Sequence, residues 1–298
     1  MTLRPSVLCP IDFSDNARGA LRYAAAIATH FQSPLTLLAV NDPLLEEAVA
    51  LSAGPAQLAQ DTRRELERFF SHTFERPPKT SDAVRLEVVS GKPASEILRV
   101  SREHACDLIV MGSHGSTGFR KLFFGSTTER VLRETSVPVL VAPGTDPGPL
   151  QLQDVRQTIR RILAPVDLSA ATTHHLATTA RVAEELGVPW LVLHVIEPVR
   201  SIVASTLGLP NMEAERRDRA ERQLEATIRS LPSANPEMLI AYGEPAEEVA
   251  KVAADRNVGL IVMGLHSSPL LGPRMGSVTY RVLCLAHRLV LALPPART

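Results

Sequence analysis

The residues best suited to chemistry in this sequence are glycines within the stretch 112–127. Gly112 and Gly115 are separated by two residues, and nine more precede Gly125. Glycine permits positive φ and a close approach of backbone N–H groups, so Gly112 and Gly115 suit an anion-binding turn. Gly125 lies at a predicted helix start, where free amides and the helix dipole favour phosphate. The stretch also offers hydroxyl groups and cations for phosphate oxygens: Ser126, Thr127, Arg120 and Lys121. It therefore predicts a polyphosphate site.

A carboxylate, Asp12, follows the first apolar run of the chain. Residues 7–11 are expected to form a buried strand, and Ser14 is a candidate N-cap for the helix that follows. Met111 and Gly112 end a second such run. In open α/β sheets, ligands bind beyond the carboxyl ends of the strands, where the winding direction reverses. If these two strands are neighbours, Asp12 and the glycines face one crevice.

Strands and helices are predicted to alternate along the chain. Apolar runs at 7–11, 35–40, 84–89, 108–111 and 137–141 alternate with helical patterns after Ser14, around 57–70, from Pro93 to about His104, and from Ser126. The strand runs mostly lack polar alternation, as expected for a parallel sheet covered by helices on both faces. We expect an α/β, doubly wound, Rossmann-like domain with strand order 3-2-1-4-5.

The whole pattern occurs twice. Residues 7–14 (VLCPIDFS) return as 162–169 (ILAPVDLS), and residues 108–114 (LIVMGSH) return as 260–266 (LIVMGLH). Asp12 and Asp167 are 155 residues apart, and Gly125 and Gly276 are 151 apart. The Pro- and Gly-rich run 143–149 marks a break between the copies. We predict domains at 1–145 and 159–298, joined by a linker at 146–158.

Composition restricts the class of function. The 298 residues carry 32 basic and 32 acidic side chains, and a balanced chain without a basic stretch lacks the electrostatic footprint of a nucleic-acid-binding protein. Cys9, Cys106 and Cys284 show no metal-ligand spacing and are interpreted as buried thiols in a reducing compartment. No apolar run approaches the roughly 18 residues of a membrane span. We expect a cytoplasmic protein with no membrane association and no structural metal.

These features together resemble the nucleotide-binding branch of the universal stress protein family. The family's glycine pattern is G-x2-G-x9-G-[S/T], and Gly112, Gly115, Gly125 and Ser126 meet every position. The resemblance extends to Pro10-x-Asp12-x-Ser14 and covers essentially the whole chain twice.

The resemblance implies that the first copy binds an adenine nucleotide, ATP, with or without Mg²⁺. Pro10, Asp12 and the backbone of Val40 would hold adenine and ribose, and the glycines would hold the phosphates. The residues implied in nucleotide binding are Pro10, Asp12, Val40, Met111, Gly112, Gly115, Arg120, Gly125, Ser126 and Thr127.

The second copy departs from the pattern. Ser267 replaces the second glycine, and eight residues separate it from Gly276. The candidates there are Asp167, Val195, Gly264, Gly276 and Ser277, with the phosphate loop expected to be degenerate.

Each of these residues also has a structural interpretation. Asp12 is a residue type that caps turns, and the glycines are common turn residues. His114 and His266 recur in the repeat and are interpreted as structural. The charged segment 213–222 is expected to be a solvated helix face with i, i+4 pairs.

Three functions remain open from the sequence: a nucleotide-binding regulatory or stress-tolerance module, a slow ATPase or phosphotransferase, and an interaction scaffold. Gly91-Lys92 is followed by Pro93 and lacks the upstream glycine of a G-x4-G-K-[S/T] loop, which favours binding over turnover. In the enzyme alternative, Ser126 or Thr127 would serve as metal ligand or phosphate acceptor, and Asp12 would orient the reactants.

The last strand of each copy, at 137–142 and 289–293, is apolar and open to pairing. Universal stress proteins typically dimerise through this strand, so the resemblance implies an intramolecular pseudo-dimer. A homodimer of the whole chain is left open, and protein partners are not readable.

Overall fold

The computed structural model describes residues 4–50, 55–74, 84–113, 125–144, 158–198, 212–231, 235–268, 272–274 and 276–295. The first half of the chain contains the elements β1 (Val7–Pro10), α1 (Asp15–His30), β2 (Leu35–Asn41), α2 (Pro43–Ala50), α3 (Pro55–Thr73), β3 (Val84–Ser90), α4 (Pro93–Glu103), β4 (Leu108–Gly112), α5 (Ser126–Glu134) and β5 (Val139–Ala142).

The second half repeats this order with one addition, and its described residues contain no counterpart of α2. Its elements are β6 (Ile162–Val166), α7 (Thr172–Leu186), β7 (Trp190–Ile196), α9 (Met212–Arg229), β8 (Glu237–Tyr242), α10 (Pro245–Asp255), β9 (Leu260–Gly264), β10 (His266–Ser268), β11 (Gly272–Arg274), α11 (Ser277–Leu285) and β12 (Leu289–Leu293). The short hairpin of β10 and β11 has no counterpart among the described residues of the first half.

Each half folds as a doubly wound parallel sheet. In the first half the strands lie in the order β3-β2-β1-β4-β5, and in the second half β12-β9-β6-β7-β8 follows the same winding. The predicted α/β class and the order 3-2-1-4-5 are therefore confirmed. In both halves the order reverses beside the first strand, between β1 and β4 and between β6 and β9.

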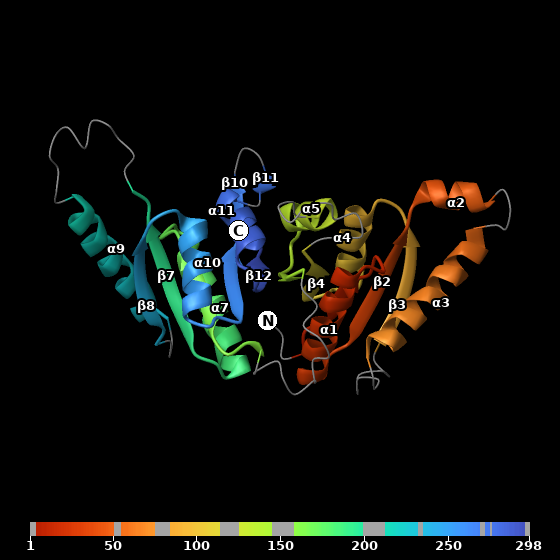
Figure 1. The fold of residues 1–298 in the computed structure, drawn as a ribbon, viewed down its shortest axis with the longest axis horizontal. Coiled ribbons are helices and arrows are strands. Elements are labelled where there is room, and N and C mark those ends of the chain that lie inside the picture. Colours follow the sequence, from red (N-terminus) through yellow and green to blue (C-terminus); the bar gives the residue numbers. More distant parts are fainter. Residues whose placement is uncertain are drawn as a thin grey trace.

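The two sheets join into a single sheet of ten strands. β12 pairs antiparallel with β5, with Val290 opposite Val141 and Leu291 opposite Leu140, and it pairs parallel with β9. Figure 1 shows the two halves side by side, meeting at this seam. The last strands thus cover each other's open edges, consistent with the predicted pseudo-dimer.

The hydrophobic core is continuous on one face of the sheet and divided on the other. Beneath α1, α3, α7 and α9 a single cluster of buried side chains runs through both halves. On the opposite face, one cluster lies under α4 and α5 and another under α10 and α11. The first of these includes Leu265 and Ala292 from the second half. The seam is therefore packed as part of the core.

Helix α1 forms where the sequence predicts it. The Ser14 side chain accepts a hydrogen bond from the Ala17 amide and caps the helix, which begins at Asp15. Its predicted buried face, formed by Leu21, Ala24, Ala25 and Ala28, is fully inaccessible to solvent. The small side chains let the helix axis lie close to the strands it covers.

The charged segment of the second half also behaves as predicted. It belongs to α9, where Arg217 Nε lies 2.8 Å from Glu221 Oε1 as an exposed i, i+4 pair. Within the described parts of the chain, no helix has the length and apolar character needed to cross a membrane.

The cysteines differ from the prediction at one position. Cys9 and Cys106 are buried, whereas Cys284 is only partly so because it lies near the end of α11. Burial raises the pKa of all three thiols, and at Cys9 the nearby Asp12 carboxylate adds to this effect. A raised pKa lowers the thiolate fraction at neutral pH, so the structure favours inert thiols.

The seam predicts that the halves do not need the connecting segment to stay together. We expect a chain cleaved at a protease site inserted within residues 146–158 to elute as one complex, because β5–β12 pairing and the shared core hold the halves. Size-exclusion chromatography at micromolar concentration, followed by mass spectrometry of the peak, tests this. Elution as two separate halves would contradict it.

Candidate functional site

A cavity of the first half lies beyond the carboxyl ends of β1, β2 and β4, at the reversal point of the sheet. It has a volume of about 530 Å³. The predicted site residues that line it are Pro10, Asp12, Val40, Met111, Gly112, Gly125, Ser126 and Thr127. The topology therefore brings together residues that lie as far apart in the sequence as Pro10 and Thr127. The predicted residues Gly115 and Arg120, with His114 and Lys121, lie outside the described residues.

Asp12 is held at the cavity by a turn. Its Oδ1 accepts hydrogen bonds from the Ser14 amide at 3.1 Å and from the Ser14 hydroxyl at 2.6 Å. Between them Phe13 has a φ of 62°, a conformation that non-glycine residues seldom adopt. The Phe13 ring packs edge-on against Phe69 of α3, with 5.7 Å between centroids. The structural interpretation of Asp12 is thus correct, and the same turn places the carboxylate on the cavity wall.

This turn recurs in the second half. Asp167 Oδ1 accepts from the Ser169 amide at 3.0 Å, and Leu168 between them has a φ of 61°. Because both copies keep an unfavourable backbone conformation at the same point, the surrounding packing must hold the turn in place.

Close packing requires a glycine at position 112, and the prediction that Gly112 supplies positive φ is wrong. The described glycines with positive φ are Gly91, Gly187 and Gly243. A Cβ atom on Gly112 would lie 3.0 Å from the Asn16 carbonyl oxygen. The glycine therefore lets the first turn of α1 approach the end of β4, which sets one wall of the cavity.

Gly125 leaves the start of α5 without a side-chain cap. It occupies the N-cap position with φ −61° and ψ 129°, and no side chain accepts a hydrogen bond from the first amides of the helix. Its own amide donates to the Ser113 carbonyl at 2.9 Å, and the Thr128 hydroxyl donates to the Gly112 carbonyl at 3.0 Å. These two bonds tie the helix start to the end of β4 and aim uncapped amides at the cavity.

Sequence reasoning missed part of the lining. Asp42 also lines the cavity, and its Oδ1 accepts from the Leu44 amide at 2.9 Å near the start of α2. Asp followed by Pro43 is a helix-start signal that could have revealed α2. Pro93 and Ile97 of α4 complete the apolar side. Among the described lining residues the charges are those of Asp12 and Asp42.

The second half has a smaller cavity at the equivalent place, with a volume of about 240 Å³. Asp167, Val195 and Gly264 line it, whereas Gly276 and Ser277 begin α11 without being among its lining residues. The loop that would cradle phosphate forms the β10–β11 hairpin, in which Ser267 is opposite Pro273. Pairing directs backbone polar groups of this loop toward each other. The hairpin lies near α5 of the first half (Figure 1).

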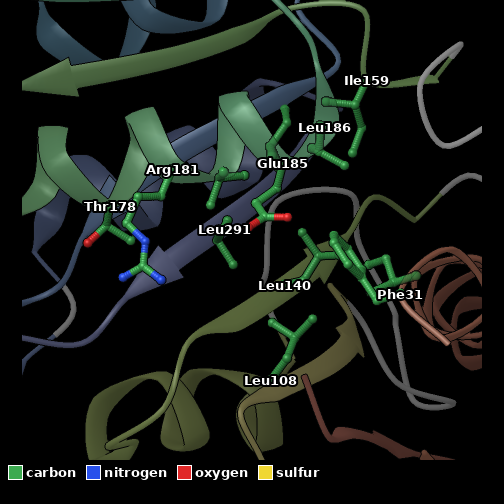
Figure 2. A pocket seen from close by; sticks show the side chains of 12 residues that line it. Phe31, Leu108, Leu140, Ile159, Thr178, Arg181, Glu185, Leu186 and Leu291 are labelled. Carbon is green, nitrogen blue, oxygen red and sulfur yellow. The ribbon is translucent and has the colours of Figure 1, made fainter. Parts of the chain in front are cut away.

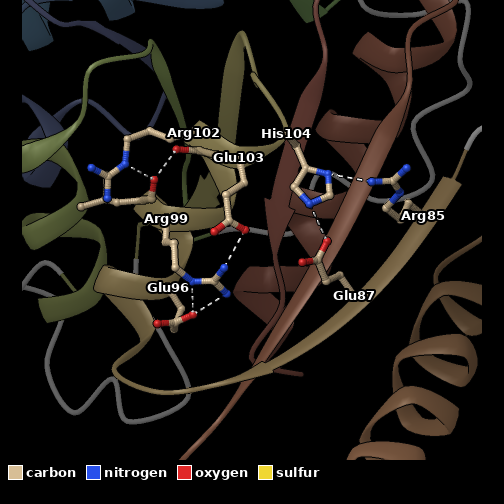
Figure 3. Close-up of polar contacts among 9 residues, drawn as sticks. Arg85, Glu87, Glu96, Arg99, Arg102, Glu103 and His104 are labelled. Atoms are coloured by element: carbon tan, nitrogen blue, oxygen red, sulfur yellow. Dashed lines mark hydrogen bonds and ion pairs between the residues drawn. The ribbon is translucent and has the colours of Figure 1, made fainter.

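Two other features lie away from these cavities. A small apolar hollow of about 60 Å³ lies at the seam between α1 and α7, where Leu140 and Leu291 form part of its floor (Figure 2). At the C-cap of α4, His104 lies between Arg85 and Glu87, with its Nε2 3.0 Å from the Glu87 carboxylate (Figure 3). These His104 contacts tie the end of α4 to the edge strand β3.

The described residues contain no cluster of three or more His, Cys, Asp or Glu that could hold a metal ion.

The fold defines a tandem protein of two α/β domains, each with a cavity where the strand order reverses. The model of the universal stress protein family matches residues 4–143 and 158–294, and the chain belongs to this family.

Relatives and solved structures agree with this assignment. Universal stress protein MJ0577 of Methanocaldococcus jannaschii is 30% identical over 149 residues, covering 45% of this chain and 92% of its own. A universal stress protein of Mycolicibacterium smegmatis is 24% identical and covers 97% of both chains. A crystal structure of a universal stress protein from Archaeoglobus fulgidus covers 98% of both chains, with a TM-score of 0.66 and 19% identity.

The two equivalent glycines at the strand ends give a matched test of the packing. We expect Gly112→Ala to lower the free energy of unfolding by about 1–3 kcal/mol, because the new methyl group crowds the Asn16 backbone. Gly264→Ala should be neutral or slightly stabilising, since the nearest atom to its Cβ would be His175 Nδ1 at 3.9 Å. Urea unfolding of both variants checks this. Equal destabilisation by the two changes would contradict it.

Proposed function

We propose that the first domain binds ATP and that the protein acts as a nucleotide-dependent regulatory or stress-tolerance module. The observation that carries this proposal is the cavity at the reversal point, because it unites Asp12, Val40 and the uncapped start of α5. Its size and its mixed polar and apolar walls suit a nucleotide. The predicted domain boundaries, the cytoplasmic location and any homodimer stay predictions.

The residues present fit the parts of ATP. Apolar groups of Pro10, Val40 and Met111 offer surface for a base, and the Asp12 carboxylate can accept hydrogen bonds from ribose hydroxyls. The amides of α5, with the hydroxyls of Ser126 and Thr127, can donate to phosphate oxygens. Arg120 and Lys121 of the glycine stretch are proposed to balance phosphate charge, and Mg²⁺ would supply further neutralisation where it accompanies ATP.

Binding is favoured over rapid turnover by the chemistry of the lining. Asp12 Oδ1 is already engaged by Ser14, and Asp42 Oδ1 by the Leu44 amide. A general base for water activation must lie within hydrogen-bond reach of the attacking water at the terminal phosphate, whereas Asp12 and Asp42 follow β1 and β2, the strands proposed to hold ribose and base. The described lining supplies positioning groups, which hold a nucleotide without driving its hydrolysis.

A charge placed at the start of α5 tests the site directly. Gly125→Asp should weaken ATP binding at least about tenfold, because like charges roughly 4 Å apart near a protein surface repel by about 4 kcal/mol before salt screening. The same change supplies an N-cap, so the free energy of unfolding should be unchanged or raised by a few tenths of a kcal/mol, about the known N-cap advantage over glycine. Isothermal titration calorimetry and thermal unfolding measure both.

Gly276→Asp is the matched control, since Gly276 occupies the same position of α11 outside the second cavity. It should leave ATP affinity unchanged. If Gly125→Asp bound ATP as tightly as the unmodified chain, the proposed phosphate end of the site would be wrong. If ATP at 100 times a measured dissociation constant failed to add about 2.7 kcal/mol to stability, the scaffold alternative would be favoured.

Measuring phosphate release distinguishes the enzyme alternative from a protein that only binds ATP. With labelled ATP and excess protein, we expect no phosphate release above the protein-free rate, because the described carboxylates of the cavity, Asp12 and Asp42, follow the strands proposed to hold ribose and base and not the phosphate end. Single-turnover measurement over hours checks this. Release that depended on Ser126 or Thr127 would favour the slow ATPase or phosphotransferase.

A further inference from the structure

The second cavity carries hydrogen-bonding side chains where the first half has alanines. The two halves correspond at a separation of 155 residues in this region. Ala17, Ala20 and Ala39 of the first half correspond to Thr172, His175 and His194 of the second half, and these three all line the second cavity. Placing polar groups in a buried wall costs free energy unless they find partners. A concerted change of this kind changes the chemistry of the cavity.

Both histidines are fixed by backbone carbonyls. His175, 8% exposed, has its Nε2 2.9 Å from the Val262 oxygen, and the Nδ1 of His194 is 2.9 Å from the Val166 oxygen. A carbonyl oxygen only accepts, so the ring nitrogen facing it carries the proton. In neutral His194 the other nitrogen, Nε2, is then a hydrogen-bond acceptor. The bonds fix the rings as parts of the cavity wall.

The hydroxyl of Thr172 is a second observation, independent of the two histidines, that points to a ligand. Its side chain is only 4% exposed, and its hydroxyl oxygen is buried without a hydrogen-bond partner among the described residues. Leaving a buried hydroxyl unpaired is costly, and most buried polar atoms in folded proteins are paired. Because Thr172 lines the cavity, rotation of its side chain on binding would bring this hydroxyl to a ligand hydroxyl or amine and complete the bond.

The phosphate end of the first site has no counterpart in the second cavity. Charge does not separate the two sites, because Asp167 and Glu197 make this lining acidic as Asp12 and Asp42 do in the first cavity. An adjoining hollow that shares Asp167 and His194 is lined by Arg216 and Arg219. The difference lies in the helix start and the loop. Val278 lines the cavity where the first half has Thr127, so a hydroxyl donor is lost at the helix start. The backbone of the neighbouring loop is used in the β10–β11 hairpin. The volume of about 240 Å³ is also less than half of that in the first domain.

We propose that the second domain binds an uncharged nucleoside, with hydrogen bonds from ligand groups to Thr172, His194 and Asp167, and that it excludes the phosphorylated form. The choice of a nucleoside rests on the proposed function, because Asp167 and Val195 repeat the positions proposed to hold base and ribose in the first domain. The two sites of one chain would then respond to different adenine compounds.

Adenosine is the probe, and the full chain is the sample. Equilibrium dialysis of labelled adenosine in the presence of saturating ATP should retain one adenosine per chain, and labelled ATP alone should bind once. Thr172→Val should weaken adenosine binding about fivefold, the ratio that one ordinary hydrogen bond contributes, and leave ATP binding unchanged. Thr172→Ser, which keeps the hydroxyl, should restore most of the affinity.

Thr179→Val is the matched control. Thr179 is fully buried in the same helix, and its hydroxyl donates to the His175 carbonyl without lining the cavity. This variant should bind adenosine as the unmodified chain does, and circular dichroism verifies that all three variants fold.

Complete displacement of adenosine by ATP, or two ATP bound per chain, would overturn the proposal. Equal affinity of the chain and Thr172→Val for adenosine would also overturn it. The chain could also bind adenosine, lose that binding only in Thr172→Val, and bind no ATP. This result would support the second site and contradict the proposed function of the first domain.

Discussion

Parallel pairing of β1 with both β2 and β4 is the constraint on which the rest of the structure depends. Because β1 lies between them, the chain winds in opposite directions on its two sides, and the helices that follow β1 and β4 leave toward opposite faces of the sheet. The carboxyl ends of the strands are left with a cavity between them. Three features shape the walls of this cavity: the Asp12 turn, the close approach of α1 at Gly112, and the uncapped start of α5.

The two halves show how one framework can carry two chemistries. The sheet, the strained turn after the first strand and the N-cap glycine are common to both. The cavity walls differ, because small side chains of α1 and β2 are replaced by polar ones in α7 and β7, and because the loop after β9 forms a hairpin. That hairpin lies against α5 of the first half, so the altered loop contributes to the contact between the halves.

The repeat, the strand order and the positions of Asp12 and Gly125 were predictable because they follow from hydrophobic periodicity and motif spacing, which the sequence displays directly. The structural role of Gly112 was not predictable, since the close approach of the Asn16 backbone is a tertiary contact that no local pattern encodes. Helix α2 was missed although Asp42-Pro43 marks its start, because a helix of eight residues shows little periodicity. The histidines of the second cavity looked isolated in the sequence. Only the fold places His175 and His194 on one wall.

In the proposed function, the first domain holds ATP with its phosphates at the start of α5. A crystal structure of the full chain grown with saturating ATP tests it most directly. We predict density for one triphosphate beside Gly125 and Ser126, with the ribose at Asp12 and the base against Val40. A first cavity filled by side chains or solvent under those conditions, in crystals that reproduce the ten-stranded sheet, would contradict the account.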